Sequence, residues 1–170
     1  MLIGAYGRFW EADKVDWSKA RLLGQRGKGR NTQVVNFGAA RGVYVLYDEL
    51  GVYYAGLCRG ENGLGGRLKD HLRDKHADRW SRFSWFAFDS PDLDGGPDEH
   101  GIHRVEQWDS IEATETTTLI KDVEALLIAA MRPWGNSANP RFQEGDEWLQ
   151  VAERATEVEL FSDIAHLVKP

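Results

Sequence analysis

The stretch of sequence that decides the fold spans residues 42–72 and reads GVYVLYDELGVYYAGLCRGENGLGGRLKDHL. It begins with two runs rich in Val and Tyr, GVYVLY and VYYAGLC, which are separated by DELG. Because β-branched and aromatic residues flank a short turn that contains Gly51, these runs predict an antiparallel hairpin. A loop with four glycines follows, and leucines then recur at every fourth position from Leu64. This spacing predicts a helix that runs to about Trp80.

Four further segments extend this pattern along the chain. RFSWFAF, at 82–88, predicts a third strand, and the acidic Pro/Gly segment 89–101 predicts a loop. TETTTLIKDVEALLIAAM, at 114–131, predicts a long helix that ends at the Arg-Pro pair that follows it. Residues 145–168 predict one C-terminal helix or a pair. Hairpin strands followed by helices indicate an α+β fold, a small antiparallel sheet flanked by helices.

Length and composition favour a single intracellular domain. The chain has 170 residues, of which 42% are apolar, so it can bury a sizeable core. We find no signal-peptide pattern and no apolar stretch long enough to cross a bilayer, so we expect no membrane partner. Cys58 is the single cysteine, which excludes an intrachain disulfide. These features predict a reducing compartment and a cytoplasmic location.

The charges of the chain are divided unevenly. Its formal net charge is −6, from 21 Lys and Arg against 27 Asp and Glu. Residues 19–82 nevertheless hold thirteen basic and six acidic residues, a balance of +7. Much of the acid lies in residues 89–101 and in the C-terminal third of the chain. Such a division indicates one face for an anionic partner. The alternative, that the charges divide by chance and are all solvated, explains it about equally well.

Five polar residues could form a site on the predicted elements. Arg67 and His71 are four apart, so they share one face of the predicted helix. The glycines before that helix would let its first N–H groups point outward, an arrangement that favours an anion. Glu124 lies at the edge of the apolar face of the second helix, where it either reaches water or binds a cation. Tyr44 and Tyr54 lie one on each hairpin strand, where tyrosines are more often packing residues.

Taken in order, these motifs resemble the GIY-YIG nuclease superfamily. GVY and YAG, nine residues apart, resemble its two signature tripeptides, and GRLKDH resembles its Arg-x-x-x-His helix. EALL followed by PWGN resembles its glutamate helix and the asparagine loop after it. The resemblance covers about residues 41–140, between a β-rich N-terminal extension (1–40) and a helical C-terminal extension (141–170). The matched residues are Tyr44, Tyr54, Arg67, His71, Glu124 and Asn136. Tyr53 is the alternative to Tyr54, which lies directly before Ala-Gly and is the better match, and Asn139 is a lesser candidate for Asn136.

The resemblance implies a three-stranded antiparallel sheet flanked by helices and the hydrolysis of DNA phosphodiesters by direct water attack. It implies that Glu124 binds one Mg²⁺ (or Mn²⁺) and that Arg67 neutralises charge on the phosphate. Tyr44 or His71 would be the general base, and the choice between them stays open. Tyr54 would orient the water or a phosphate oxygen. Asn136 would brace the site.

Basic residues near these motifs predict contacts with nucleic acid. The predicted DNA-contacting residues are Arg67, Lys69 and Arg73 on the helix, and Arg26, Lys28 and Arg30 in the loop QRGKGRN. Cutting both strands with one active site favours a homodimer or two successive nicks. One rival interpretation is a nucleic-acid-binding module that has the fold but does not cut. A second is a protein-interaction domain whose contact surface is the acidic region 89–112.

Overall fold

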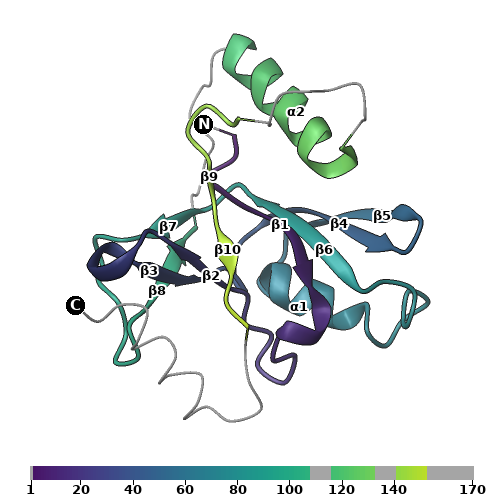
Figure 1. The fold of residues 1–170 in the computed structure, drawn as a ribbon, viewed down its shortest axis with the longest axis horizontal. Coiled ribbons are helices and arrows are strands. Elements are labelled where there is room, and N and C mark those ends of the chain that lie inside the picture. The colour runs from purple at the N-terminus through teal and green to yellow at the C-terminus, as the bar shows by residue number, and fades with distance from the viewer. Residues whose placement is uncertain (1, 108–115, 133–140, 153–170) are drawn as a thin grey trace.

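The structure is a computed structural model that describes residues 2–107, 116–132 and 141–152. Within these residues the chain forms two five-stranded mixed sheets and two α-helices (Figure 1). The strands are β1 (Ala5–Glu11), β2 (Leu23–Arg26), β3 (Gln33–Asn36), β4 (Gly42–Asp48), β5 (Gly51–Cys58), β6 (Arg82–Ala87), β7 (Ser90–Asp92), β8 (Ile102–Glu106), β9 (Asp146–Glu147) and β10 (Leu149–Gln150). The helices are α1 (Gly63–Asp70) and α2 (Thr116–Met131), with short 3-10 turns η1 (Ala12–Lys14) and η2 (Gly29–Asn31).

The prediction of an α+β fold with a small three-stranded sheet flanked by helices is wrong, because the fold is β-rich. The first sheet has the order β5-β4-β6-β1-β9, and the second has the order β10-β2-β3-β8-β7. Parallel pairs β1–β9 and β3–β8 make both sheets mixed. The physical reason lies in β6, which is buried at every position after Arg82. A strand buried on both faces belongs inside a sheet. In the predicted three-stranded sheet β6 would be an edge strand, but in the structure β1 pairs along its second edge.

Strand pairing crosses both of the predicted segment boundaries, at residues 40 and 140. β1, from the first forty residues, pairs with β6, and β10, from the last thirty, pairs with β2. Residues 146–147 and 149–150 form two short strands where a helix was predicted, so that expectation is wrong for this part of the segment. The remainder of the predicted C-terminal helix, from residue 153, lies outside the described residues.

Aromatic side chains fill the space between the two sheets. Phe37, which directly follows β3, contacts Trp85 of β6 and Trp148, with ring centroids 4.4 and 5.2 Å apart. Trp10 of β1 meets the same Trp85 edge-on at 5.1 Å. All four side chains are buried. Stacked and edge-on aromatic pairs of this kind add to the free energy gained by burying their area, so the two sheets are held by one shared core.

The two helices pack on opposite faces of the first sheet. Side chains alternate along β4, so Tyr44 and Leu46 face α1 and share a core with Leu64 and Leu68. Val45 and Tyr47 face the other way, into a core with α2. The Tyr47 hydroxyl donates to the Ala130 carbonyl of α2 at 2.9 Å. Figure 1 shows α2 on one side of β1, β4 and β6 and α1 on the other.

Several local predictions are confirmed. β4 and β5 form the predicted antiparallel hairpin, β6 is the predicted third strand, and α2 covers most of the predicted long helix. α1 begins as predicted but ends at Asp70, well before Trp80, and turns follow it. The predicted loop 89–101 contains the short strand β7. Within the part of the chain that the structure describes, neither helix is long and apolar enough to span a membrane.

Candidate active site

The centre of the candidate site is a contact between Tyr44 on β4 and His71 at the end of α1. The Tyr44 hydroxyl oxygen lies 2.6 Å from His71 Nε2, and both side chains are fully buried. Arg67 lies one helical turn before His71, so its guanidinium reaches the same region, and its positive charge acts on the Tyr44 hydroxyl. The structure therefore brings together three of the residues that the sequence singled out.

Asp74 extends this contact on the far side of the imidazole. Its Oδ2 lies 2.7 Å from His71 Nδ1, and its Oδ1 accepts a hydrogen bond from the His76 backbone N–H at 2.8 Å. Tyr44, His71 and Asp74 thus form a continuous hydrogen-bonded line from a phenol through an imidazole to a carboxylate. Asp74 was not among the residues that the motifs in the sequence singled out.

A second Tyr–His pair lies against the first. The Tyr53 hydroxyl is 3.0 Å from His76 Nδ1, and the His76 ring packs on Tyr54 with centroids 4.4 Å apart. His76 also meets the His71 ring edge-on at 4.8 Å. The predicted residue Tyr54 contacts His71 directly, with centroids at 5.4 Å. Tyr53, which the sequence offered only as an alternative to Tyr54 for the motif tyrosine, is thus a further residue of the site, and so is His76, which no motif indicated.

A β-bulge explains how two consecutive tyrosines reach the same histidines. Leu46 of β4 pairs with Tyr54, whereas the next residue, Tyr47, pairs with Val52, so Tyr53 is the extra residue. An extra residue in one strand turns two adjacent side chains toward one face, and bulges of this kind are common beside active sites. Both Tyr53 and Tyr54 therefore pack on the α1 side of the sheet.

The glycine of YAG provides the space for the Tyr44 ring. Gly56 pairs directly with Tyr44 across the hairpin. A Cβ atom added at Gly56 would meet the Tyr44 hydroxyl and ring within 3 Å, so any larger residue would push the phenol away from His71. At the start of β4, Gly42 lies equally close to the backbone of β6. Both motif glycines therefore have a steric role in this sheet.

The expectation that the N-terminus of α1 binds an anion is wrong. Its first N–H groups are used inside the protein: Gly63 donates to Gly60, Leu64 to Ala40 at 2.8 Å, and Gly65 to the Gly38 carbonyl at 2.9 Å. The helix glycines serve this packing, because a Cβ at Gly63 or Gly65 would collide with backbone carbonyl oxygens. Any anion would have to bind at Arg67 instead.

Burial sets the protonation states in the line of residues. It raises the pKa of Tyr44 to about 12, although Arg67 acts to lower it. Burial also lowers the pKa of His71, against the hydrogen bond to Asp74, which acts to raise it. Slight burial acts to raise the pKa of Asp74, but its hydrogen bonds from the His76 amide and His71 outweigh this and hold the pKa below its usual value. At neutral pH the line is therefore phenol, neutral imidazole and carboxylate.

A cavity opens beside Arg67. Its volume is about 630 Å³, and the polar residues that line it include Arg59, Glu61, Asn62, Arg67 and Asp70. The Asp70 Oδ2 atom lies 4.0 Å from Arg67 Nη1. Two arginines in one cavity suit a phosphate group. The carboxylates that line this cavity are Glu61 and Asp70.

The structure does not bring Glu124 to this cavity. Glu124 is exposed on α2, and the buried face of α2 packs on the opposite side of the sheet from Arg67. The donor set at Arg67 therefore does not include the carboxylate that the resemblance implies for Mg²⁺. Asn136 and Asn139 lie outside the described residues.

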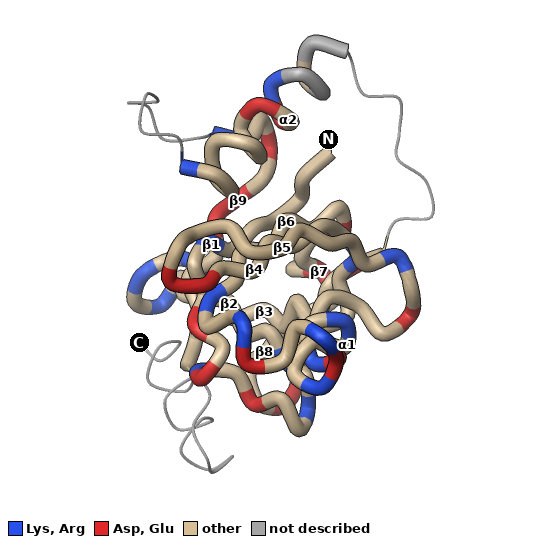
Figure 2. Tube along the Cα trace, turned by 90° about the vertical axis from the view of Figure 1, so that its right-hand side faces the viewer, with Lys and Arg blue, Asp and Glu red and all other residues tan. Residues whose placement is uncertain are grey.

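The predicted DNA-contacting residues are in different situations. Arg26 is paired with the Asp146 carboxylate and lies over the Trp148 ring at 5.1 Å, so its guanidinium already makes contacts within the protein. Lys69 Nζ donates to the Ser18 carbonyl at 3.0 Å. Lys28, Arg30 and Arg73 are exposed. Figure 2 shows that basic positions around α1 alternate with acidic ones, so the excess of positive charge in 19–82 is not a purely basic face.

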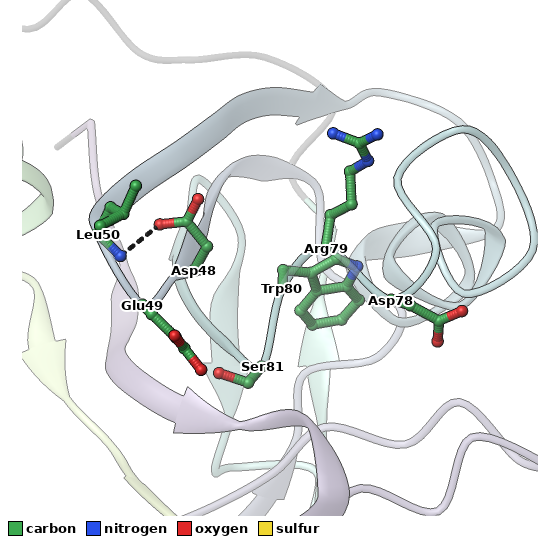
Figure 3. A pocket seen from close by; sticks show the side chains of 7 residues that line it. All are labelled: Asp48, Glu49, Leu50, Asp78, Arg79, Trp80 and Ser81. Carbon is green, nitrogen blue, oxygen red and sulfur yellow. Dashed lines mark hydrogen bonds between the residues drawn. The ribbon is translucent and has the colours of Figure 1, made fainter.

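A second hollow lies beside the segment that leads from the histidines of the site to the start of β6. Its volume is about 380 Å³, and Asp48, Glu49 and Asp78 to Ser81 line it together with Leu50 (Figure 3). The Asp48 carboxylate accepts a hydrogen bond from the Leu50 N–H at 2.8 Å, which shapes the hairpin turn. Trp80 Nε1 donates to the His71 carbonyl at 3.5 Å, so this return segment contacts the backbone of the site.

His71, Asp74 and His76 also have a spacing that a metal ion could use. Their donor atoms lie within 4.8 Å of one another, and two imidazoles with one carboxylate suit Zn²⁺ better than Mg²⁺. Hydrogen bonds already pair His71 with Asp74 and His76 with Tyr53. A network of hydrogen bonds therefore accounts for the cluster.

The comparisons with known proteins identify no relative. No protein-family model matches the chain, and no curated protein and no solved structure matches it.

Proposed function

We propose that the protein is a metal-dependent endonuclease that hydrolyses DNA phosphodiester bonds by direct attack of water. The observation that carries the proposal is the 2.6 Å contact between the Tyr44 hydroxyl and His71 Nε2, beside Arg67. A buried phenol in contact with a neutral imidazole has a path for its proton. The resemblance of Tyr44, Tyr54, Arg67 and His71 to the matching residues of GIY-YIG nucleases supports the same reaction.

In this proposal Tyr44 and His71 share the role of the base along one proton path. With a pKa of about 12, Tyr44 is almost entirely a phenol at neutral pH and is by itself a poor base. His71 can accept the Tyr44 proton while Tyr44 accepts a proton from the attacking water. Both residues then act in one step. Arg67 stabilises the negative charge that develops on the phosphate.

The substrate class follows from the cavity. Arg59 and Arg67 line it, and a phosphodiester supplies the anionic oxygens that two guanidinium groups bind well. Lys28, Arg30 and Arg73, exposed elsewhere, could add contacts to the DNA backbone. A single site cuts one strand at a time, so we infer either successive nicks or a homodimer. We place the protein in the cytoplasm, where its single cysteine stays reduced.

A supercoiled plasmid assay tests the proposal. Purified protein in excess, with Mg²⁺ or Mn²⁺, is expected to convert the plasmid to its nicked form, and EDTA is expected to stop the reaction. Tyr44→Phe is expected to slow nicking by roughly 10²–10⁴-fold, the usual contribution of a proton-transfer group. Tyr47→Phe is the matched control, because it also removes a tyrosine hydroxyl from β4, but on the opposite face of the sheet.

Failure to nick supercoiled, single-stranded or branched DNA, or RNA, would overturn the proposal. The alternative is then a nucleic-acid-binding module, which the position of Glu124 away from Arg67 favours. Salt-dependent DNA binding would support that alternative. Its absence would favour a protein-interaction domain that uses the acidic region 89–112, of which the structure describes residues 89–107.

Substitution of Glu124 tests whether this residue binds the metal ion that the proposed reaction requires. Because Glu124 is exposed on the other face of the sheet, Glu124→Gln is expected to change the nicking rate by less than about threefold. The measurement is the single-turnover rate at several Mg²⁺ concentrations. A fall of about a hundredfold that excess Mg²⁺ restores would instead assign the metal to Glu124 and contradict the opposite-face arrangement.

A further inference from the structure

Asp74 holds two hydrogen-bond donors with its two oxygens. Oδ1 accepts the backbone N–H of His76 at 2.8 Å, and Oδ2 lies 2.7 Å from Nδ1 of His71. The carboxylate is ionised at neutral pH, so both oxygens can only accept. A backbone N–H can only donate, and an imidazole nitrogen beside a carboxylate must therefore carry a proton. Asp74 thus dictates which nitrogen of His71 is protonated.

We propose that Asp74 is a positioning residue of the site, which holds His71 as the tautomer protonated at Nδ1 so that Nε2 accepts the Tyr44 hydroxyl proton. The contact at Nε2 fits this tautomer, because a nitrogen without a proton is the acceptor that a phenol needs at 2.6 Å. The consequence for catalysis rests on the proposed nuclease function. The tautomer itself does not, and can be measured without any substrate.

The surroundings of His71 leave the ring little freedom to turn. Arg67 faces it from α1, Tyr44 from β4, Tyr54 from β5, and Asp74 and His76 from the segment after the helix. His76 is in turn held by the Tyr53 hydroxyl at 3.0 Å. The second Tyr–His pair therefore packs against the first and keeps the imidazole aligned with Asp74 on one side and Tyr44 on the other.

In the proposed step, proton transfer through Tyr44 and His71 accompanies the attack of water on phosphorus. The water oxygen forms a bond to phosphorus as one of its protons passes to the Tyr44 oxygen, and the Tyr44 proton passes to His71 Nε2. The bond from phosphorus to the leaving oxygen breaks, and that oxygen keeps the electron pair and takes a proton from solvent. His71 becomes an imidazolium, whose charge faces the Asp74 carboxylate 2.7 Å away. Stabilising that imidazolium is the second contribution of Asp74.

Asp74→Asn is the sharpest test, because asparagine has one acceptor oxygen for two donors. The His76 N–H still needs that oxygen, so the NH₂ group of the new side chain would face His71 Nδ1. The proton of His71 would then move to Nε2, which could no longer accept from Tyr44. The hydrogen bond that shapes the turn would survive, so the variant should fold. Asp78→Asn is the matched control, an exposed aspartate in the same segment.

The first readout is the nitrogen-15 NMR spectrum of the His71 imidazole at neutral pH, in EDTA. We expect a protonated Nδ1 and an unprotonated Nε2 in the wild type and in Asp78→Asn, and the reverse in Asp74→Asn. The second readout is the nicking rate, which should fall roughly a hundredfold or more in Asp74→Asn and stay unchanged in Asp78→Asn. Asp74→Glu, which keeps a carboxylate, should recover part of the rate.

Three results would overturn the inference. The first is a wild-type His71 protonated at Nε2. The second is an Asp74→Asn protein that keeps the wild-type tautomer or nicks at the wild-type rate. The third is a purified protein that retains Zn²⁺ and whose His71 signals change when EDTA removes it. That result would make His71, Asp74 and His76 a metal site. A wild type with the expected tautomer that cuts no nucleic acid would refute the nuclease alone and leave the role of Asp74 in fixing the tautomer intact.

Discussion

His71→Gln is expected to slow plasmid nicking by about 10²–10⁴-fold while the protein stays folded. The amide oxygen of glutamine can take the place of Nε2 and accept the Tyr44 hydroxyl, which lies 2.6 Å from that nitrogen in the wild type. An amide cannot gain the proton, however, so the path from Tyr44 ends there. The substitution therefore separates hydrogen bonding from proton transfer. The measurement is the single-turnover nicking rate at saturating protein.

The pH dependence of the same rate identifies the base. The transfer needs neutral His71, and burial lowers the His71 pKa below 6.5, so the wild-type rate should rise through a pKa under 6.5 and then level off. The groups around the imidazole that could modify this limb are Arg67, Asp74, His76, Tyr44 and Tyr54. If the Tyr44 phenolate acted alone, the rate would instead rise about tenfold per pH unit toward a pKa of about 12.

His71→Gln should show that second profile in its residual activity, because only the phenolate is left as a base. His100→Gln is the control, since it changes a half-exposed histidine away from α1. A His71→Gln protein with the wild-type rate would exclude His71 from the reaction. A wild-type rate that rises without a plateau up to about pH 10 would leave Tyr44 as the sole base and contradict the transfer to His71.

The part of the site that could be predicted from the sequence is the part fixed by local geometry. Tyr44 and Tyr54 lie on two strands joined by a short turn, and Arg67 and His71 lie one helical turn apart. Hairpin pairing and helical periodicity act over a few residues, so the relative positions of these residues follow from local rules. Their side chains do gather on one face of the first sheet.

The remaining residues of the site depend on features that periodicity does not reveal. Leucine spacing extended the helix to Trp80, which would have turned His76, five residues after His71, toward a different face of the helix. Instead α1 ends at Asp70, and Asp74 captures the His76 N–H in a turn, as aspartates often do. Both side chains are then drawn toward His71. The bulge that turns Tyr53 inward likewise depends on pairing with β4.

The sheets could not be predicted because their edges are completed by distant segments. β9 and β10 are two residues each and lack the alternating pattern that identifies a strand. Their place follows from contacts with β1 and β2, which lie near the other end of the chain. The position of Glu124 has the same cause, because the face on which α2 packs is decided by the tertiary fold and not by the helix sequence.

Trp148→Ala is expected to lower the free energy of unfolding by about 3–5 kcal/mol, the range for removing a buried large aromatic side chain. Trp148 is 1% exposed and lies between β9 and β10, where the chain passes from the first sheet to the second. Its backbone N–H donates to the Tyr6 carbonyl at 2.8 Å, and its carbonyl accepts from Trp10 Nε1 at 3.2 Å. Its ring packs on Phe37 at 5.2 Å. Urea denaturation followed by circular dichroism measures the change.

Leu149→Ala is the matched control for this substitution. Leu149 is the next residue and is 62% exposed, so its loss should change stability by less than about 0.5 kcal/mol. Trp148→Phe should fall between the two, because a smaller ring keeps part of the contact with Phe37. The Trp148 Nε1 has no hydrogen-bond partner among the described residues, so its loss adds no cost. If Trp148→Ala cost under about 1 kcal/mol, the packing of Trp148 between the two sheets would not be a main source of stability.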